Sequence, residues 1–368
     1  MKFIITYINR IFFISILNIL ILCQASNAQL FETLFITEKY VAYQCSTPPK
    51  IDGVINDEQW LSANWTEAFV NIEGRTMPKP AYETKVKMLW DNKCFYIAAI
   101  LYDKHIWATM QKPESSIFDD NDFEVYIDPN GDTHDYMKLE INALGTMCDL
   151  FMDKPYRDGG IADLDCNFEG IKKAVKVYGI VNRTSKKDSC WTIELAIPWK
   201  SMIEYSDTKK VPQDGEQWRV NFLRVQWNTT IKDYEYHKDK GPDKKPLPPM
   251  HWSWSPQGSQ DMHQPETWGY VQFSSNIVGT EVAPFIDIPD EKLIWSLWQV
   301  YYLYQTYPLN YAKVEENFLM FKNKKYASSQ DFKLVELGNK RDKYIARAHS
   351  TAKPGYWYIR KDGKIWYE

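Results

Sequence analysis

The sequence lacks most of the short motifs that indicate a particular catalytic or binding chemistry. Beyond its N-terminal segment, no apolar run is long enough to cross a membrane. It has no phosphate-binding loop, no Gly-x-Ser-x-Gly elbow and no His-Glu-x-x-His zinc motif. The formal net charge is only −4, so no overall basic field is available to attract nucleic acid. We therefore expect no nucleic-acid partner and no membrane-spanning segment in the mature chain.

Cysteine is also scarce. Of the 6 cysteines, none forms a Cys-x-x-Cys pair, so zinc binding is not indicated. Those that follow the N-terminal segment are Cys45, Cys94, Cys148, Cys166 and Cys190. Their odd number leaves at least one unpaired and leaves open one or two disulfide bridges. We expect most to be buried as small hydrophobic residues.

Residues 1–28 have the pattern of a signal peptide. Lys2 and Arg10 flank an apolar run over 11–22, and Ser26-Asn27-Ala28 offers small residues for cleavage. A retained membrane anchor is the alternative, but the run is short for a spanning helix. We therefore expect an exported protein, located in the periplasm, on the cell surface or in the medium.

What the sequence has in quantity is aromatic side chains. They make up 15% of the residues and include 15 Trp and 24 Tyr. Aromatic rings fill the cores of β-proteins, and exposed rings can also stack against sugar rings. For each aromatic residue, the sequence leaves open whether it lies in the core or stacks against a sugar.

The clearest local pattern lies between residues 118 and 142. Apolar and polar residues alternate with a period of two over 123–128 and again over 136–142, which is typical of half-buried strands. Asn130-Gly131 lies between the two runs and is a strong hairpin signal, because both residues tolerate positive φ. The pattern predicts an antiparallel hairpin with one apolar face. Its polar face, either plain solvent-facing sheet or a site, carries Glu124, Tyr126, Lys138, Glu140 and Asn142.

Further strand patterns lie on both sides of this hairpin. Residues 83–90 and 218–227 alternate, while 94–102 is nearly continuously apolar, as in a strand buried on both faces. We interpret 232–249, which is dense in Lys, Asp and Pro, as a solvated loop. Roughly ten short strands separated by turn signals predict a mainly β domain over 46–274, an antiparallel β-sandwich or jelly-roll.

The composition changes after about residue 275. Asp290 is a candidate N-cap for a helix that begins at Glu291 and ends before Pro308. A second helical segment over 311–321 precedes three expected strands, the last two at 356–359 and 365–367. We expect residues 285–368 to form a small α+β appendage packed on the sandwich rather than an independent catalytic domain.

Several short motifs follow one another along the chain in a characteristic order. They are Ile51-Asp52-Gly53 with Trp60, Leu89-Trp90-Asp91 followed by Phe95-Tyr96-Ile97, Asp122-Phe123-Glu124-Val125-Tyr126-Ile127-Asp128, Ile193-Glu194-Leu195-Ala196-Ile197-Pro198-Trp199, Val220-Asn221-Phe222, Trp254-Ser255 and Pro265-Glu266-Thr267-Trp268-Gly269. With this ordered set, residues 46–274 resemble family 9 carbohydrate-binding modules and their relatives in secreted bacterial proteins. The resemblance implies an antiparallel β-sandwich, an exposed sugar-binding cleft and bound calcium with a structural role.

In that family a sugar lies between two Trp rings, and a carboxylate, an amide and a basic side chain bond its hydroxyls. The resemblance places the carboxylate at Glu124 and the amide at Asn142. Phe118 stands where the upstream Trp is expected, Met262 lies near the second ring's position, and Glu140 falls at the basic position. Because of these departures, a preference for the ends of glucose or xylose polymers is not carried over. The candidate sugar-binding residues are Phe118, Glu124, Tyr126, Lys138, Glu140, Asn142, Trp254 and Met262.

Two carboxylates on one sheet face also allow a catalytic hypothesis. Glu124 and Glu140 could act as acid/base and nucleophile in the cleavage of an O-glycosyl bond. The simpler interpretation is that they accept hydrogen bonds from sugar hydroxyls or solvent, because nothing else in the chain supplies an activated nucleophile. Lys138 would form an ion pair or meet an acidic sugar. We expect a binding protein rather than an enzyme and, if an enzyme, a glycoside hydrolase.

The hairpin turn supplies hard oxygen ligands. Asp128, Asn130 and Asp132 are candidate ligands for a structural Ca²⁺ ion, and Asp119, Asp120 and Asp122 supply further oxygens near the turn. Gly131 falls at the fourth position, so the spacing departs from the twelve-residue calcium loop. A solvated acidic turn is the alternative. The leading hypothesis overall is an exported protein that binds polysaccharide or oligosaccharide and serves a glycan-degrading system together with its other components. The alternatives are a glycoside hydrolase and a structural or cell-surface interaction protein without sugar binding.

Overall fold

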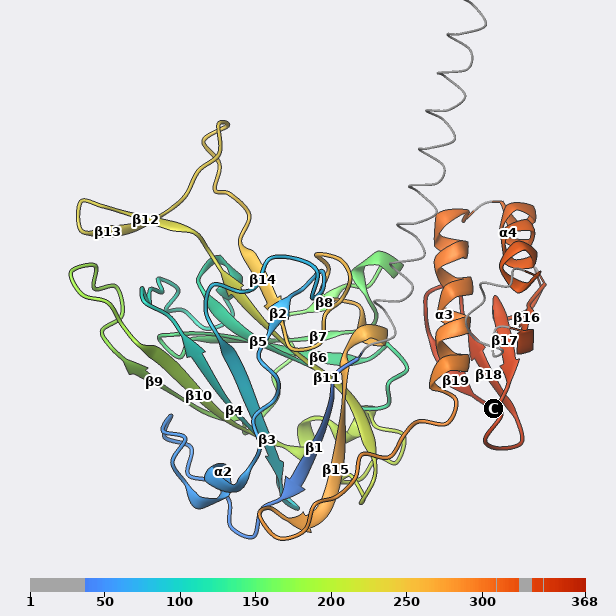
Figure 1. Ribbon diagram of the computed structural model, residues 1–368, viewed down its shortest axis with the longest axis horizontal. Coiled ribbons are helices and arrows are strands. Elements are labelled where there is room, and N and C mark those ends of the chain that lie inside the picture. The colour runs from blue at the N-terminus through green and yellow to red at the C-terminus, as the bar shows by residue number, and fades with distance from the viewer. Residues whose placement is uncertain (1–36, 309, 324–332, 340) are drawn as a thin grey trace, which may run out of the picture. The chain divides into compact units, whose positions relative to one another are not determined.

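The computed structural model describes residues 37–308, 310–323, 333–339 and 341–368, and Thr37–Glu368 form one compact unit. Strands dominate, and two helices accompany a small sheet near the C-terminus (Figure 1). The predicted fold class, mainly β with a small α+β part, is confirmed. Within the described ranges, no helix combines the length and apolar character that crossing a membrane requires.

Thirteen strands form one continuous hydrogen-bonded sheet. In chain order they are β1 (Lys39–Gln44), β2 (Val70–Asn71), β3 (Thr84–Trp90), β4 (Cys94–Tyr102), β5 (Asp122–Asp128), β6 (Tyr136–Asn142), β7 (Met147–Met152), β8 (Ala162–Asp163), β9 (Lys172–Tyr178), β10 (Cys190–Pro198), β11 (Gln217–Gln226), β14 (Met250–Ser253) and β15 (Gly269–Ile277). The order across the sheet is β8-β7-β6-β5-β11-β15-β1-β3-β4-β10-β9, and β14 pairs with β11 and β2. The strands on one side of β1 in this order pack against the strands on its other side.

Strand β1 joins the two halves. It pairs in parallel with β15 on one side and with β3 on the other, whereas the remaining pairs of this sheet are antiparallel. The predicted antiparallel sandwich therefore holds everywhere except at β1.

The main core lies between the two halves and is rich in aromatic rings. Trp218 and Trp199 both pack edge-on against Phe273, with ring centroids 5.2 and 5.6 Å apart. Trp254 lies in the same core, where its ring centroid is 5.8 Å from that of Phe222. Many of the aromatic residues therefore fill the core, because the inward positions of both halves need large apolar side chains.

The predicted hairpin forms as β5 and β6. Its connection is longer than a two-residue turn and runs from Pro129 to Asp135. Gly131 adopts a left-handed φ of 66°, but the neighbouring positive φ values belong to Thr133 and Asp135 rather than to Asn130. The Asn-Gly signal therefore located the turn but not its type.

A hairpin overlaps the start of one predicted loop. Strands β12 (Thr229–Lys232) and β13 (Glu235–Lys238) pair at the start of the segment interpreted as a solvated loop, and Figure 1 shows them projecting from the sandwich. Helix α2 (Glu58–Ser62) buries Trp60, as expected. All five cysteines of the described residues are free thiols, so no disulfide forms among them.

The C-terminal part contains α3 (Glu291–Thr306), α4 (Tyr311–Asn323) and an antiparallel sheet of β16 (Val335–Leu337), β17 (Ala346–His349), β18 (Tyr356–Ile359) and β19 (Ile365–Tyr367). Helix α3 begins where predicted, but Asp290 makes no side-chain cap. Its carboxylate instead accepts hydrogen bonds from Ser350, Thr351 and Trp357. This residue therefore ties the start of α3 to the small sheet.

Polar contacts join this C-terminal part to the sandwich. Glu266 accepts a hydrogen bond of 2.5 Å from the Tyr302 hydroxyl and one of 2.9 Å from Arg157. At a second point, the Lys364 ammonium lies 2.8 Å from a carboxylate oxygen of Asp132 in the hairpin turn. The boundaries 46–274 and 285–368 stay predictions.

Candidate functional site

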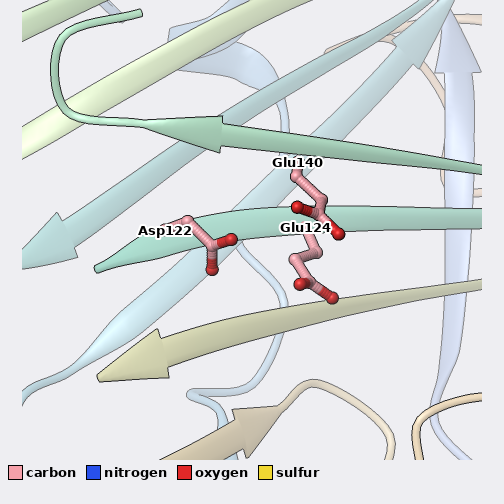
Figure 2. A group of neighbouring side chains, drawn as sticks. All are labelled: Asp122, Glu124 and Glu140. Atoms are coloured by element: carbon pink, nitrogen blue, oxygen red, sulfur yellow. The ribbon is translucent and has the colours of Figure 1, made fainter. Parts of the chain in front are cut away.

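The polar face of the β5–β6 hairpin carries four charged side chains that are almost entirely buried: Asp122, Glu124, Lys138 and Glu140. Strand register explains why they meet. Glu124 is paired directly with Glu140 across the two strands, and Asp122 lies two residues before Glu124 on the same face. Figure 2 shows the three carboxylates on neighbouring strands. The prediction that Glu124 and Glu140 share a face is confirmed.

Lys138 holds the two glutamates together. Its ammonium lies 2.6 Å from Oε1 of Glu140 and 3.2 Å from Oε1 of Glu124. The Tyr126 hydroxyl donates a hydrogen bond to the other oxygen of Glu124. The ion pair predicted for Lys138 is therefore present. Charge-assisted hydrogen bonds of this kind fix carboxylate orientation within a buried site.

Burial and mutual repulsion change the protonation of this cluster. Burial raises the pKa of Glu124 to about 7, with Lys138 opposing the shift and Glu140 adding to it. Burial, followed by repulsion from Glu124 and Glu140, raises the pKa of Asp122 as well. For Lys138, burial alone would lower the pKa, but attraction to Glu124 and Glu140 outweighs it and raises the pKa overall.

An exposed aromatic ring adjoins the cluster. Phe118 belongs to the short helix η1 (Ile117–Asp119) and is 48% exposed. Its backbone N–H donates to Oε2 of Glu140 at 3.2 Å, and its carbonyl accepts from Nε1 of Trp227 at 3.0 Å. The Lys238 ammonium lies 3.5 Å from the centroid of the Trp227 ring. Two aromatic residues and a lysine thus lie next to the buried carboxylates.

Sequence reasoning missed Trp227 and Lys238, and it named Asp122 only as an oxygen ligand near the hairpin turn. Trp227 does continue the alternation of the 218–227 run, so period two could have placed it on the face of Leu223 and Val225. Its proximity to Phe118 depends on the pairing of β11 with β5, which no local pattern reveals. Lys238 was hidden because its strand lies in the segment interpreted as a loop.

The other predicted sugar-binding residues take different positions. Met262 packs with Tyr126 in a second apolar cluster on the polar face of the hairpin, so it stays close to the site. Asn142 is fully buried, and its amide is engaged with Met110, Asp120, Leu144 and Thr146. A sugar could bond Asn142 only by displacing one of these partners. Its role as a sugar ligand stays a prediction.

Trp254 lies in the main core rather than beside the charged cluster. It is buried, and a Cβ on Gly269 would lie 2.5 Å from its ring, which shows how closely the backbone approaches. Since the ring has no free face in this structure, Trp254 supports the sandwich and offers no stacking surface to a sugar.

The hairpin turn does not fit a calcium ion as it stands. The two carboxylate oxygens of Asp128 accept hydrogen bonds from the N–H groups of Gly131 and Thr133. Asp132 accepts from the N–H of His134 and pairs with Lys364. Asn130 accepts from the N–H of Asp132. The oxygens are engaged within the turn, and an ammonium already supplies the positive charge.

The chain matches a known family over the region just described. Residues 51–233 match the family model described as carbohydrate family 9 binding domain-like. These residues therefore form a domain of that family. No curated protein sequence matches the chain.

Solved structures of related proteins are similar only at low identity. A family 9 carbohydrate-binding module from Caldicellulosiruptor kristjanssonii in complex with cellotriose shares 14% identity, covering 68% of this chain and 100% of that one, with a TM-score of 0.42. A structure of such a module from the same organism with glucose shares 15% identity over 66% and 100%, with a TM-score of 0.41. A protein from Bacteroides uniformis ATCC 8492, provisionally described as carbohydrate-binding, shares 16% over 65% and 100%, with a TM-score of 0.47.

Proposed function

We propose that this chain is an exported carbohydrate-binding protein that holds a polysaccharide or oligosaccharide at the polar face of the β5–β6 hairpin. The observation that carries the proposal is the exposed ring of Phe118, whose backbone is hydrogen-bonded to Glu140 of the buried charged cluster. An exposed aromatic ring offers a flat apolar face to a sugar, and the hydrogen bond to Glu140 holds the backbone of Phe118 in place. The family of residues 51–233 supports the same function.

Binding fits the site better than hydrolysis does. Glu124 and Glu140 are 2% and 3% exposed, and both face the ammonium of Lys138. A glycoside hydrolase needs one carboxyl group that protonates the leaving oxygen and a second that attacks or activates water. Because one lysine pairs with both carboxylates, they are not arranged for these two separate roles. Export, suggested by the signal-peptide pattern, is consistent with a role in polysaccharide catabolism.

Calorimetry against a panel of oligosaccharides and polysaccharides tests the proposal. We expect saturable binding of at least one glycan and no release of reducing sugar from it. Binding to none of them would contradict the proposal and favour an interaction protein without sugar binding. Reducing-sugar release that disappears in Glu124→Gln would favour the glycoside hydrolase.

A further inference from the structure

The four-stranded sheet of the C-terminal part has two faces of different character. Apolar side chains on one face are buried, and helix α3 packs against β16, β17 and β18. This buried face is made of Val335, Ala346, Ala348, Ile359 and Ile365. Since side chains alternate along a strand, the residues between them point to the opposite face. We call this the outer face, and its side chains, all at least partly exposed, are Glu336, Arg347, His349, Tyr356, Tyr358 and Trp366.

Strand register aligns a row of side chains across the outer face. Arg347 lies directly opposite Glu336 on one side and Tyr358 on the other. Tyr358 in turn lies opposite Trp366, and the two rings stack with their centroids 5.3 Å apart and their planes at 13°. The Arg347 guanidinium also lies 4.8 Å from the ring centroid of Tyr356. Partly exposed aromatic rings therefore gather beside an arginine, an arrangement suited to stacking against a flat ligand.

A pocket adjoins this row of side chains. It has a volume of about 660 Å³ and is lined by Tyr304 of α3, Tyr311 of α4 and Tyr344, among others. Tyr344 connects the pocket to the row, because its ring centroid is 5.1 Å from that of Tyr358. A pocket of this size is large enough for a small organic ligand or one unit of a longer chain.

The charge of this region is positive, although the whole chain has a formal net charge of −4. Residues 341–368 contain seven Lys and Arg against three Asp and Glu. Lys343 and Lys361 line the pocket and are exposed. Within the described part of the chain neither takes part in an ion pair, unlike Arg360 and Lys364. Their ammonium groups can therefore meet a negatively charged ligand.

We propose that the outer face and the adjoining pocket form a second glycan-binding site, which takes an acidic polysaccharide, either carboxylated or sulfated. Sugar rings stack on Tyr358 and Trp366, and the acidic groups meet Lys343 and Lys361. Aromatic rings together with positive charge complement a chain of anionic sugars. The site lies outside residues 51–233, so the family of that domain does not imply it. It also does not depend on whether the β5–β6 hairpin binds a sugar.

Affinity electrophoresis of the full chain in native gels tests the proposal. The gels contain dextran sulfate or polygalacturonate, which separates sulfated from carboxylated ligands, and neutral dextran is the reference. We expect at least one of the acidic polysaccharides to retard the chain and dextran to leave its mobility unchanged. Added sodium chloride should weaken the binding, because salt screens exposed charges.

Variants locate the binding on the chain. Lys343→Ser with Lys361→Ser removes both ammonium groups from exposed positions, and we expect it to weaken binding about tenfold. Lys186→Ser with Lys187→Ser is the matched control, since it removes the same charge from exposed positions between β9 and β10 and should bind like the wild type. Trp366→Ala removes a stacked ring and should also weaken binding about tenfold.

The lysine variant keeps the test decisive if Trp366→Ala does not fold. Four results would each overturn the proposal: no retardation by either acidic polysaccharide, wild-type binding in the Lys343 and Lys361 variant, wild-type binding in a folded Trp366→Ala, or equal losses in the lysine variant and its control. The last would mean that binding follows net charge alone. The first would favour a partner protein as the occupant of the outer face.

Discussion

The indole N–H of Trp227 donates a hydrogen bond of 3.0 Å to the carbonyl of Phe118 and so joins β11 to the short helix beside the charged cluster. The Lys238 ammonium lies 3.5 Å from the Trp227 ring centroid. The two aromatic residues come from segments far apart in the sequence. The proposed sugar site at the polar face of the hairpin therefore includes both rings.

We expect Trp227→Ala to weaken glycan binding by about 1–2 kcal/mol, because it removes a ring and releases the Phe118 carbonyl. Trp227→Phe keeps a ring but loses the N–H donor, and it should cost about 1 kcal/mol. Calorimetric titration with a glycan that binds the wild type measures both changes. Wild-type affinity in Trp227→Ala would place the sugar elsewhere.

A buried ion pair anchors the C-terminal part. Glu266 is fully buried as a side chain and contacts Arg157 and Tyr302. Glu266→Gln keeps the shape but leaves the Arg157 charge with Asp158 as its remaining partner. We expect the free energy of unfolding to fall by about 2–3 kcal/mol, measured by urea denaturation.

Glu169→Gln serves as the control for that measurement. Glu169 and Lys200 lie 4.0 Å apart and both side chains are largely exposed. Exposed pairs contribute little to stability. Equal unfolding free energies for the two variants would mean that the contact between Glu266 and the C-terminal part adds nothing.

Acid should destabilise the fold through His263. Burial, followed by repulsion from Lys138 and Arg157, lowers the pKa of His263 from 6.5 to about 3. A histidine with a lowered pKa is kept neutral by the fold. Its contribution to stability is therefore complete above pH 6.5 and is lost as the pH falls towards 3. The loss approaches about 1.4 kcal/mol for each pH unit within that window.

We expect His263→Gln to flatten this part of the stability profile, measured by urea unfolding between pH 7 and pH 4. Gln can still bond the Tyr136 hydroxyl, which lies 2.7 Å from Nδ1 of the imidazole. His237 is exposed, so it stays hydrated in the fold, and His237→Gln should keep the wild-type slope. A wild-type slope in His263→Gln would assign the acid sensitivity to other groups.

The sequence predicted the parts of the site that depend on local pattern. Period two located β5 and β6 and placed Glu124, Tyr126, Lys138 and Glu140 on one face, because alternation decides which side chains share a face. It did not separate a solvated face from a buried one. That difference arises from Trp268 and Met262, which cover the hairpin from a distant segment.

Contacts between segments that lie far apart in the sequence could not be predicted from it. Nothing local shows that β11 pairs with β5 and brings Trp227 to Phe118, or that Lys364 reaches the turn at Asp132. Trp254 is an example of a residue that the sequence wrongly assigned to the site. Its motif suggested a site residue, while inter-sheet packing places it in the core.

The most direct test of the central claim compares the glycan affinity of Phe118→Ala with that of Tyr178→Ala. Tyr178, on β9, is 42% exposed and so matches Phe118 in kind and exposure. Calorimetry with a glycan bound by the wild type should show that Phe118→Ala loses about 1–3 kcal/mol, the scale of one large apolar contact, while Tyr178→Ala binds normally. Unchanged affinity in Phe118→Ala, or equal losses in both variants, would contradict a sugar site at the polar face of the β5–β6 hairpin.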